Sequence, residues 1–214
     1  MDMATGAWWR GPRTLSAMGR EEHTATAVRR RDSAATKAAI LNAAREAFTE
    51  HGYDGAGVRD IARAAEVDAR LIGRYFGSKE GLFAAVVDVV FEKSIMMTPA
   101  GNADAARDLL TGTGSVPTAG LLLTLRSAPN PRAAEIMREN IEGNYARRLA
   151  GALDGPDAEG RAGLLVAICS GVLLSRLVLG HTAFTGPDVE RLVPYLHAAL
   201  DAVAKDPTAE GSAD

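Results

Sequence analysis

Two arginines with helical spacing are the residues of this chain best placed to do chemistry. Arg70 and Arg74 lie four positions apart, so both guanidinium groups share one face of a helix. A guanidinium group binds a phosphate, or reads the edge of a guanine, through two parallel hydrogen bonds, and such a base contact discriminates by about 1–3 kcal/mol. The spacing also fits a solvated face on which arginines pair with acidic neighbours. Both interpretations stay open from these residues alone.

The sequence predicts no catalytic or metal-binding site. The histidines are scattered without the spacing of metal ligands, and the acidic residues are spread over helix faces. The chain has no G-x-S-x-G, no P-loop and no glycine-rich dinucleotide turn. We therefore expect a protein that is not an enzyme and that holds neither a metal nor another cofactor. The histidines are His23, His51, His181 and His197.

Composition narrows the class of protein. The 214 residues are 47% apolar but only 5% aromatic, and alanine and leucine are abundant, which favours an all-α fold. The single cysteine, Cys169, suits the reducing cytoplasm, and the N-terminal stretch lacks the apolar segment of a secretion signal. Because the net charge is −3, any affinity for nucleic acid must come from the local placement of basic residues. We expect a cytoplasmic protein.

Short helices must position the two arginines. Apolar stripes at helical spacing predict four of them, at residues 33–51, 58–65, 68–76 and 78–91. Asp68 and Ser78 stand where an N-cap is favoured. The second and third helices form a helix-turn-helix at about 57–76, and a helix about 10–12 Å across fits a major groove about 12 Å wide. Tight helix pairs also occur in many bundles, so the pair alone does not decide function.

The chain is expected to have two helical domains between two tails. Residues 1–32 lack sustained periodicity and predict a mobile tail, which ends in Arg29, Arg30 and Arg31. That basic run is either a solubilising segment or an arm that touches phosphates. The helix-turn-helix domain covers 33–94, a second helical domain covers 95–205, and 206–214 is a disordered tail.

Three separated blocks resemble the N-terminal DNA-binding domain of TetR-family transcriptional regulators. They are ILNAAREAFTEHGYDG, VRDIARAAEV and YFGSKEGLF, in this order within Thr36–Lys93. The resemblance implies a ligand-responsive homodimeric repressor that binds a palindromic operator in double-stranded DNA, with two recognition helices about 34–36 Å apart. The segment LRSAPNPRAAEIMRENIE and the long apolar helix after it are similar to one group of TetR ligand and dimerisation domains, which gives 95–205 those two roles.

The chain departs from the family pattern at several positions. Family members often have Thr or Ser before the second block, where this chain has Ala56 and Gly57. Glu66 stands at the usual turn glycine, where a positive φ would cost about 1–2 kcal/mol. Leu71 and Gly73 replace the frequent Thr and Tyr of the recognition helix. The fold signal survives these changes, but an operator inferred from other members does not.

The residues that match the family's DNA contacts can still be named. Lys79 matches the phosphate-contacting lysine at the start of the fourth helix, and Arg59 is a candidate phosphate contact. Arg63 is expected to be solvated. Tyr75 either offers its hydroxyl to a phosphate or packs against the first helix. The expected DNA-binding residues are Gly57, Arg59, Ala69, Arg70, Gly73, Arg74, Tyr75 and Lys79.

A long apolar helix is predicted at about 158–183. Its run from Leu164 to Gly180 is nearly long enough to cross a membrane, but Arg176 within it argues against a span, so we expect no membrane contact. Small residues on one face, together with the last helix, predict a dimer interface instead. The expected interface residues are Gly171, Ser175, Leu192, Leu196, Ala199 and Leu200.

An effector pocket among the middle helices is implied by the resemblance. Most of its candidate residues also fit an ordinary core, and Cys169 is expected to be a small buried hydrophobe rather than a sensor thiol. The candidates are Phe91, Ile95, Met97, Leu122, Arg126, Met137, Ile141, Asn144, Tyr145, Cys169 and Leu173. The alternative function is an all-helical protein that binds a small molecule without binding DNA.

Overall fold

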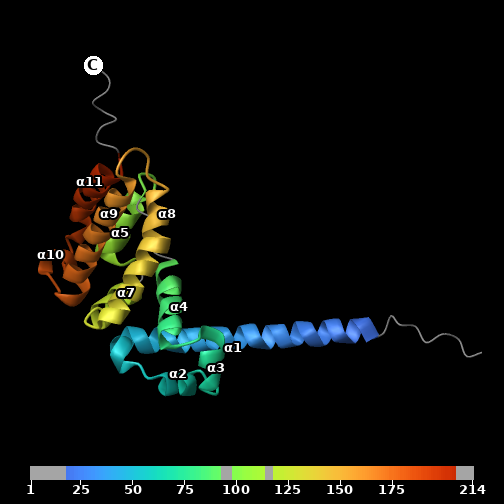
Figure 1. Ribbon diagram of the computed structural model, residues 1–214. Helices are drawn as coiled ribbons and strands as arrows, with labels where there is room; N and C mark the ends of the chain where they lie inside the picture. The colour runs from blue at the N-terminus through green and yellow to red at the C-terminus, as the bar shows by residue number, and fades with distance from the viewer. Residues whose placement is uncertain (1–17, 93–97, 114–117, 206–214) are drawn as a thin grey trace, which may run out of the picture. The chain divides into compact units, whose positions relative to one another are not determined.

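The computed structural model describes the backbone of residues 18–92, 98–113 and 118–205, and the side chains of these ranges from Ser33 onward. Every regular element in these ranges is a helix (Figure 1), which confirms the all-α prediction. The chain divides after Ala39 into two compact units. Both hydrophobic cores lie in the second unit, Ile40–Asp214.

The first helix is longer than the sequence pattern predicts. Helix α1 spans Met18–Gly55, with a kink at the non-helical Gly52, instead of beginning at Ser33. Arg29–Arg31 therefore stand on helical backbone rather than in an irregular tail. The added stretch has no proline and is rich in Ala, Glu and Arg, which favour helix, so nothing in it stops the helix. The predicted mobile tails at 1–17 and 206–214 lie outside the described residues.

The helix-turn-helix region follows the prediction closely. Its helices are α2 (Val58–Ala64), α3 (Arg70–Phe76) and α4 (Lys79–Glu92). The Asp68 carboxylate accepts the Arg70 N–H at 2.8 Å, and the Ser78 hydroxyl accepts the Gly81 N–H at 3.2 Å, which confirms both N-caps. Glu66 has a φ of 55°, the left-handed conformation expected at the family's glycine position.

A first core fixes these helices to two helices from the second half of the chain. Apolar residues of α1 to α4 pack with Leu123 of α6 (Thr118–Ser127) and with Ile136 and Met137 of α7 (Pro131–Asn140). Helices α1 to α4 therefore share one buried core with α6 and α7. The largest fully buried side chains of this core are Ile40, Phe48, Ile61, Ile72, Leu82, Phe83 and Leu123.

A second core holds the remaining helices together. These are α5 (Asn102–Thr111), the π-helix η1 (Ile141–Ala146), α8 (Arg147–Ala150), α9 (Ala158–Leu173), the π-helix η2 (Leu174–Val178), α10 (Thr182–Thr185), the 3₁₀ turn η3 (Val189–Leu192) and α11 (Val193–Ala204). Asn130 caps α7 by accepting the Ala133 N–H at 3.0 Å. Pro194 lies in the first turn of α11, which begins at Val193, so its missing N–H costs nothing there.

The stretch Ala158–Val178 is long and apolar enough to cross a membrane, with a mean hydropathy of 1.7. One such helix is weak evidence for a span. Arg161 is buried and donates to the carbonyl oxygens of Pro156 and Ala204 at 3.0 Å each. Arg176 is half-buried and donates to the Leu110 carbonyl oxygen at 3.2 Å. Both arginines thus bind their own chain at this stretch.

Candidate nucleic-acid interface and cleft

Helix α3 presents a polar outer face over an apolar inner one. Ile72 is buried in the first core and Leu71 packs against it, while Arg70, Gly73 and Arg74 are exposed. A Cβ added at Gly73 would meet nothing within 4 Å, so the backbone there is open to any surface that approaches. Ala69, just before the helix, is half-buried. The structure thus brings the two arginines together on one accessible face.

The start of α2 gives the second expected contact region. Gly57 precedes the helix in extended conformation and supplies no side-chain cap. Arg59 in the first turn is exposed, as a phosphate contact requires. Arg63 pairs with Asp60 at 2.7 Å in an exposed i,i+3 pair, in line with the expectation that it is a solvated residue. Of this group, Gly57 and Arg59 remain DNA-contact candidates.

The start of α4 is the third region. Lys79 is half-buried, and its ammonium lies 4.6 Å from the centroid of the Tyr53 ring. Among the described residues Lys79 forms no ion pair, so its charge remains available to a phosphate. Tyr75 is half-buried and packs against the first core, which agrees with the packing alternative for this residue.

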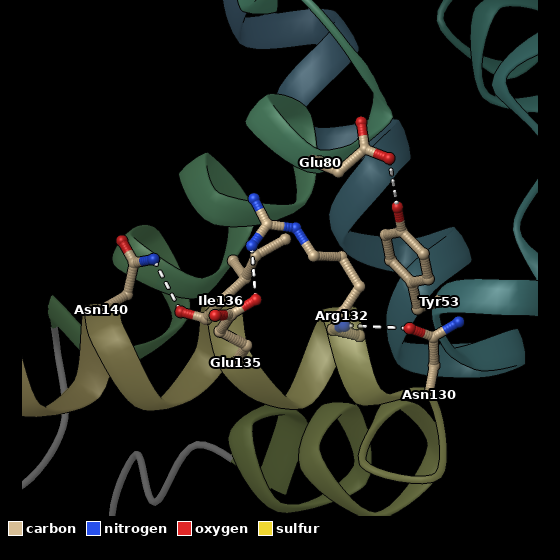
Figure 2. A network of polar contacts seen from close by, with 8 residues as sticks. Tyr53, Glu80, Asn130, Arg132, Glu135, Ile136 and Asn140 are labelled. Carbon is tan, nitrogen blue, oxygen red and sulfur yellow. Dashed lines mark hydrogen bonds and ion pairs between the residues drawn. The ribbon is translucent and has the colours of Figure 1, made fainter.

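Figure 2 shows one polar contact between Tyr53 and the start of α4, and others that stay within α7 and its N-cap. The Tyr53 hydroxyl donates to Oε1 of Glu80 at 3.0 Å. Burial raises the pKa of Tyr53 to about 12, with the Glu80 hydrogen bond as a second cause, so the phenol stays protonated. The pKa of Glu80 is lowered, first by its hydrogen bond from Ser78 and then by its own backbone N–H and Tyr53. Arg132 pairs instead with Glu135.

Three more hydrogen bonds connect the end of α1 to the corner between α6 and α7. The Tyr53 N–H donates to the Ser127 hydroxyl at 3.1 Å, and Asn130 donates to Asp54 at 2.8 Å. Arg126 donates to the Thr49 carbonyl oxygen. Sequence reasoning missed these three hydrogen bonds, because residues so far apart in the chain give no periodic signal of their contact.

A cleft of about 560 Å³ lies between α4 and the η1–α8 segment. Of the expected effector-binding residues, Phe91, Asn144 and Tyr145 line it. The rings of Phe91 and Tyr145 are 6.3 Å apart, and Asn144 donates to the Asp88 carboxylate at 2.6 Å. The lining residues that sequence reasoning missed are Val87, Asp88, Val89, Glu92, Asn140, Gly143, Arg147 and Arg148.

The other expected effector residues lie elsewhere. Met137 is buried in the first core and Cys169 in the second, where burial raises the pKa of the thiol to about 12. Ile141 and Leu173 pack at the edges of these cores. Arg126 is engaged with the end of α1. Leu122 is half-buried and does not line the cleft, and Ile95 and Met97 lie outside the described residues.

The π-helix explains two of the missed residues, Arg147 and Arg148. A π turn holds one more residue than an α turn, so every residue after it is rotated from the face that a continuous α-helix would give. In η1 this rotation places Asn144, Arg147 and Arg148 toward α4. Arg148 donates to the carbonyl oxygens of Phe91 and Glu92 at 3.5 and 3.2 Å, so it caps the end of α4.

The predicted dimer residues divide between surface and core. Gly171 and Ala199 are exposed, and Ser175, Leu192 and Leu196 are half-buried. The prediction for Leu200 is wrong, because its side chain has no exposed surface and belongs to the second core of its own chain. Large exposed apolar residues on the same elements are instead Leu164, Leu177, Val178, Leu179 and Tyr195.

Comparisons with known proteins agree in both halves of the chain. Residues 40–86 match the model of "Bacterial regulatory proteins, tetR family", and residues 103–203 match "Tetracyclin repressor-like, C-terminal domain". The chain is 30% identical over 167 residues to the HTH-type transcriptional repressor SCO4008 of Streptomyces coelicolor, covering 76% of this chain and 85% of that protein.

A second relative matches over a shorter stretch. The HTH-type transcriptional regulatory protein RaaS of Mycobacterium tuberculosis is 52% identical over 56 residues, which is 26% of each chain. Among solved structures, the TetR-family regulator SCO0857 of Streptomyces coelicolor is similar, with 27% identity and a TM-score of 0.52 over 81% of this chain and 96% of that one.

Proposed function

We propose that this chain, which belongs to the TetR family of bacterial transcriptional regulators, reads an operator with the outer face of α3. The observation that carries the proposal is that Arg70, Gly73 and Arg74 share one exposed face while Ile72 anchors the helix from behind. The open backbone at Gly73 lets the helix approach the groove closely. Arg70 and Arg74 then reach guanine edges or phosphates.

Phosphate contacts fix the register of α3 in the groove. We assign them to Lys79 at the start of α4 and to Arg59 with the backbone N–H of Gly57 at the start of α2. Contacts to phosphate carry no sequence information, but they add affinity that falls with salt, because each one releases counterions. Specificity then rests on α3 alone within one protomer.

We propose that two protomers bind together on a palindromic site. One short reading helix offers few base contacts, so a monomer would bind weakly. The exposed apolar side chains of α9, η2 and α11 support a dimer interface, since Leu164, Leu179 and Tyr195 expose 57%, 58% and 76% of their surface. On α9, a Cβ at Gly163 or Gly171 would meet nothing within 4 Å, so a partner helix can approach closely. This use assigns the apolar stretch to a protein partner in the cytoplasm, not to a membrane.

We propose that the cleft between α4 and η1 takes a small-molecule effector. It has apolar and aromatic walls in Val87, Phe91 and Tyr145, with Asp88 and Asn144 as orienting polar groups. Helix α4 also begins at the proposed phosphate contact. A ligand that shifts α4 therefore changes the spacing between the two α3 helices of the dimer. Near-complete release of DNA needs about 5.5 kcal/mol of differential ligand affinity between the two conformers. Without ligand the dimer stays on its operator, and this occupancy represses transcription.

Selection of bound fragments from host genomic DNA with the purified protein tests the core of this proposal. A palindromic consensus is expected, with affinity that falls steeply between low and moderate salt. Arg70→Ala with Arg74→Ala should abolish specific binding while the dimer stays intact. If the double variant binds the selected fragments as tightly as wild type, α3 does not read them. Arg107→Ala with Arg138→Ala, which removes the same charge from exposed positions on α5 and α7, is the matched control.

A further inference from the structure

Tyr53 stands at a crossing of contacts that its place in the core does not require. Its ring is 94% buried and packs edge-on against Phe83 at 5.0 Å, with Phe48 stacked at 6.1 Å. A phenylalanine would fill this space equally well. The additional contacts are made by the other face of the ring, by the hydroxyl and by the backbone N–H, and they lead to two different parts of the protein.

The first set of contacts leads to the start of α4. The Lys79 ammonium lies 4.6 Å from the ring centroid, a cation–π distance. The hydroxyl donates to Glu80, the next residue, at 3.0 Å (Figure 2). Tyr53 therefore touches two consecutive residues in the first turn of α4, one through charge and one through a hydrogen bond.

The second contact leads to the end of α6. The Tyr53 N–H donates to the buried Ser127 hydroxyl at 3.1 Å, where α6 ends. The residue before it, Gly52, has a φ of 70°, and a Cβ there would lie 2.3 Å from the Arg126 carbonyl oxygen. This close approach is possible only with glycine, so the backbone at Tyr53 is held directly against the α6–α7 corner.

We propose that Tyr53 is a positioning residue for DNA binding, which holds the Lys79 ammonium where a phosphate can reach it. Its link to Ser127 ties that lysine to the corner between α6 and α7, so a movement of this corner is felt at the phosphate contact. The inference rests on the proposed DNA-binding function and adds a residue that does not itself touch DNA. A free lysine side chain loses rotamer entropy when it binds, and a lysine already held on a ring loses less.

The placement of Lys79 can be measured without DNA. The sequence holds only four lysines, Lys37, Lys79, Lys93 and Lys205. Reductive methylation with ¹³C-formaldehyde keeps their charge and gives each a separate NMR signal. Lys79→Met identifies the Lys79 signal by its loss. We expect this signal to be displaced upfield by the ring current, to move to the position of the other lysines in Tyr53→Leu, and to keep its place in Tyr53→Phe.

Circular dichroism reports whether each variant is folded, because a folded variant keeps the helical signal of the wild-type protein. If Tyr53→Leu does not fold, the test rests on the other two proteins. The Lys79 signal must then be displaced upfield in wild type and must stay displaced in Tyr53→Phe. A Lys79 signal at the ordinary lysine position in the wild-type protein overturns the proposal, as does a displaced signal that Tyr53→Leu leaves in place.

The role in DNA binding is tested by a double-mutant cycle on a selected operator. Tyr53→Leu should weaken operator binding by about two- to five-fold for each half-site, the usual size of an exposed cation–π contact. In a Lys79→Met background it should have no further effect, because its contribution passes through the lysine. An equal loss in both backgrounds would mean a general structural role and would overturn the proposal. Lys205→Ala, which removes a distant charge at the end of α11, controls for net charge.

The two proposals fail in different ways. If wild type selects no DNA at all, the proposed function fails, and the role of Tyr53 in binding fails with it even where the NMR displacement is present. If the operator is bound through Arg70 and Arg74 but Lys79→Met leaves its affinity unchanged, the function stands and the inference about Tyr53 is refuted.

Discussion

Two glycines in this chain should respond in opposite directions to the same substitution by alanine. Gly52 has a φ of 70°, and a Cβ there would lie 2.3 Å from the carbonyl oxygen and 2.9 Å from the carbonyl carbon of Arg126. Gly73 lies inside α3 with nothing within 4 Å of an added Cβ. One substitution thus meets backbone, which cannot rotate away as a side chain can, and the other meets open space.

The expected magnitudes follow from these surroundings. At Gly52 the left-handed backbone costs an alanine about 1–2 kcal/mol, and the overpacking against α6 adds about 1–3 kcal/mol. Gly52→Ala should therefore lower the free energy of unfolding by about 2–5 kcal/mol. Gly73→Ala should raise it by about 0.5–1 kcal/mol, because alanine loses less backbone entropy in a helix.

Urea titrations followed by circular dichroism measure both values, with each variant serving as the control for the other. A Gly52→Ala protein within about 0.5 kcal/mol of wild type would refute the close approach of α1 to the Arg126 carbonyl, since no ordinary relaxation removes both costs. Gly73→Ala carries a second expectation, because its methyl group stands on the face proposed to enter the groove. Operator affinity should fall although the protein becomes more stable.

Three further outcomes are expected. Leu164→Asp with Tyr195→Asp should turn the dimer into a folded monomer in sedimentation experiments, and an unchanged dimer would place the interface elsewhere. Cys169, with a pKa raised by burial to about 12, should react with a thiol reagent at pH 8 only as fast as the protein unfolds, and rapid labelling of the native protein would contradict its burial. The pKa of Glu80 lies below its ordinary value of 4.5, so its carboxylate stabilises the fold above that value and this stabilisation is lost as pH falls through the folded pKa. Glu80→Gln should accordingly be less stable than wild type at pH 7 and approach it in acid, and a constant difference in urea midpoints across that range would exclude the linkage.

The helix-turn-helix region and the start of α7 were predictable because their sequence signals are local. Asp68, Ser78 and Asn130 each cap the helix that follows within three residues, and such short-range chemistry is visible in a sequence. The positive φ of Glu66 followed from the glycine that relatives carry at that position. The first core was likewise visible as apolar stripes.

The helices after α4 were less predictable, because their arrangement depends on features that leave no local signal in the sequence. The cleft is framed by η1, and nothing in the letters IEGNYA separates a π turn from an α turn. Leu200 and Ala199 are neighbours on an apolar helix, and only the packing of α11 on α5 and α9 decides that the first is buried and the second exposed. Contacts such as Tyr53 with Ser127 join positions that periodicity cannot relate.

The wider turn in η1 makes the length of this segment as important as its composition. Gly143 sits in that turn with open space around it, so removing it would let the backbone relax into an ordinary helix with no steric obstacle. Because a π turn exceeds an α turn by one residue, the segment after it would keep its orientation about the helix axis, and Arg147 and Arg148 would still face the end of α4. A residue deleted from the α-helical turns of α7 would instead rotate everything downstream by about 100° and turn both arginines away from the cleft. Single-residue deletions are therefore expected to be tolerated in η1 and to disrupt the cleft when they fall just before it.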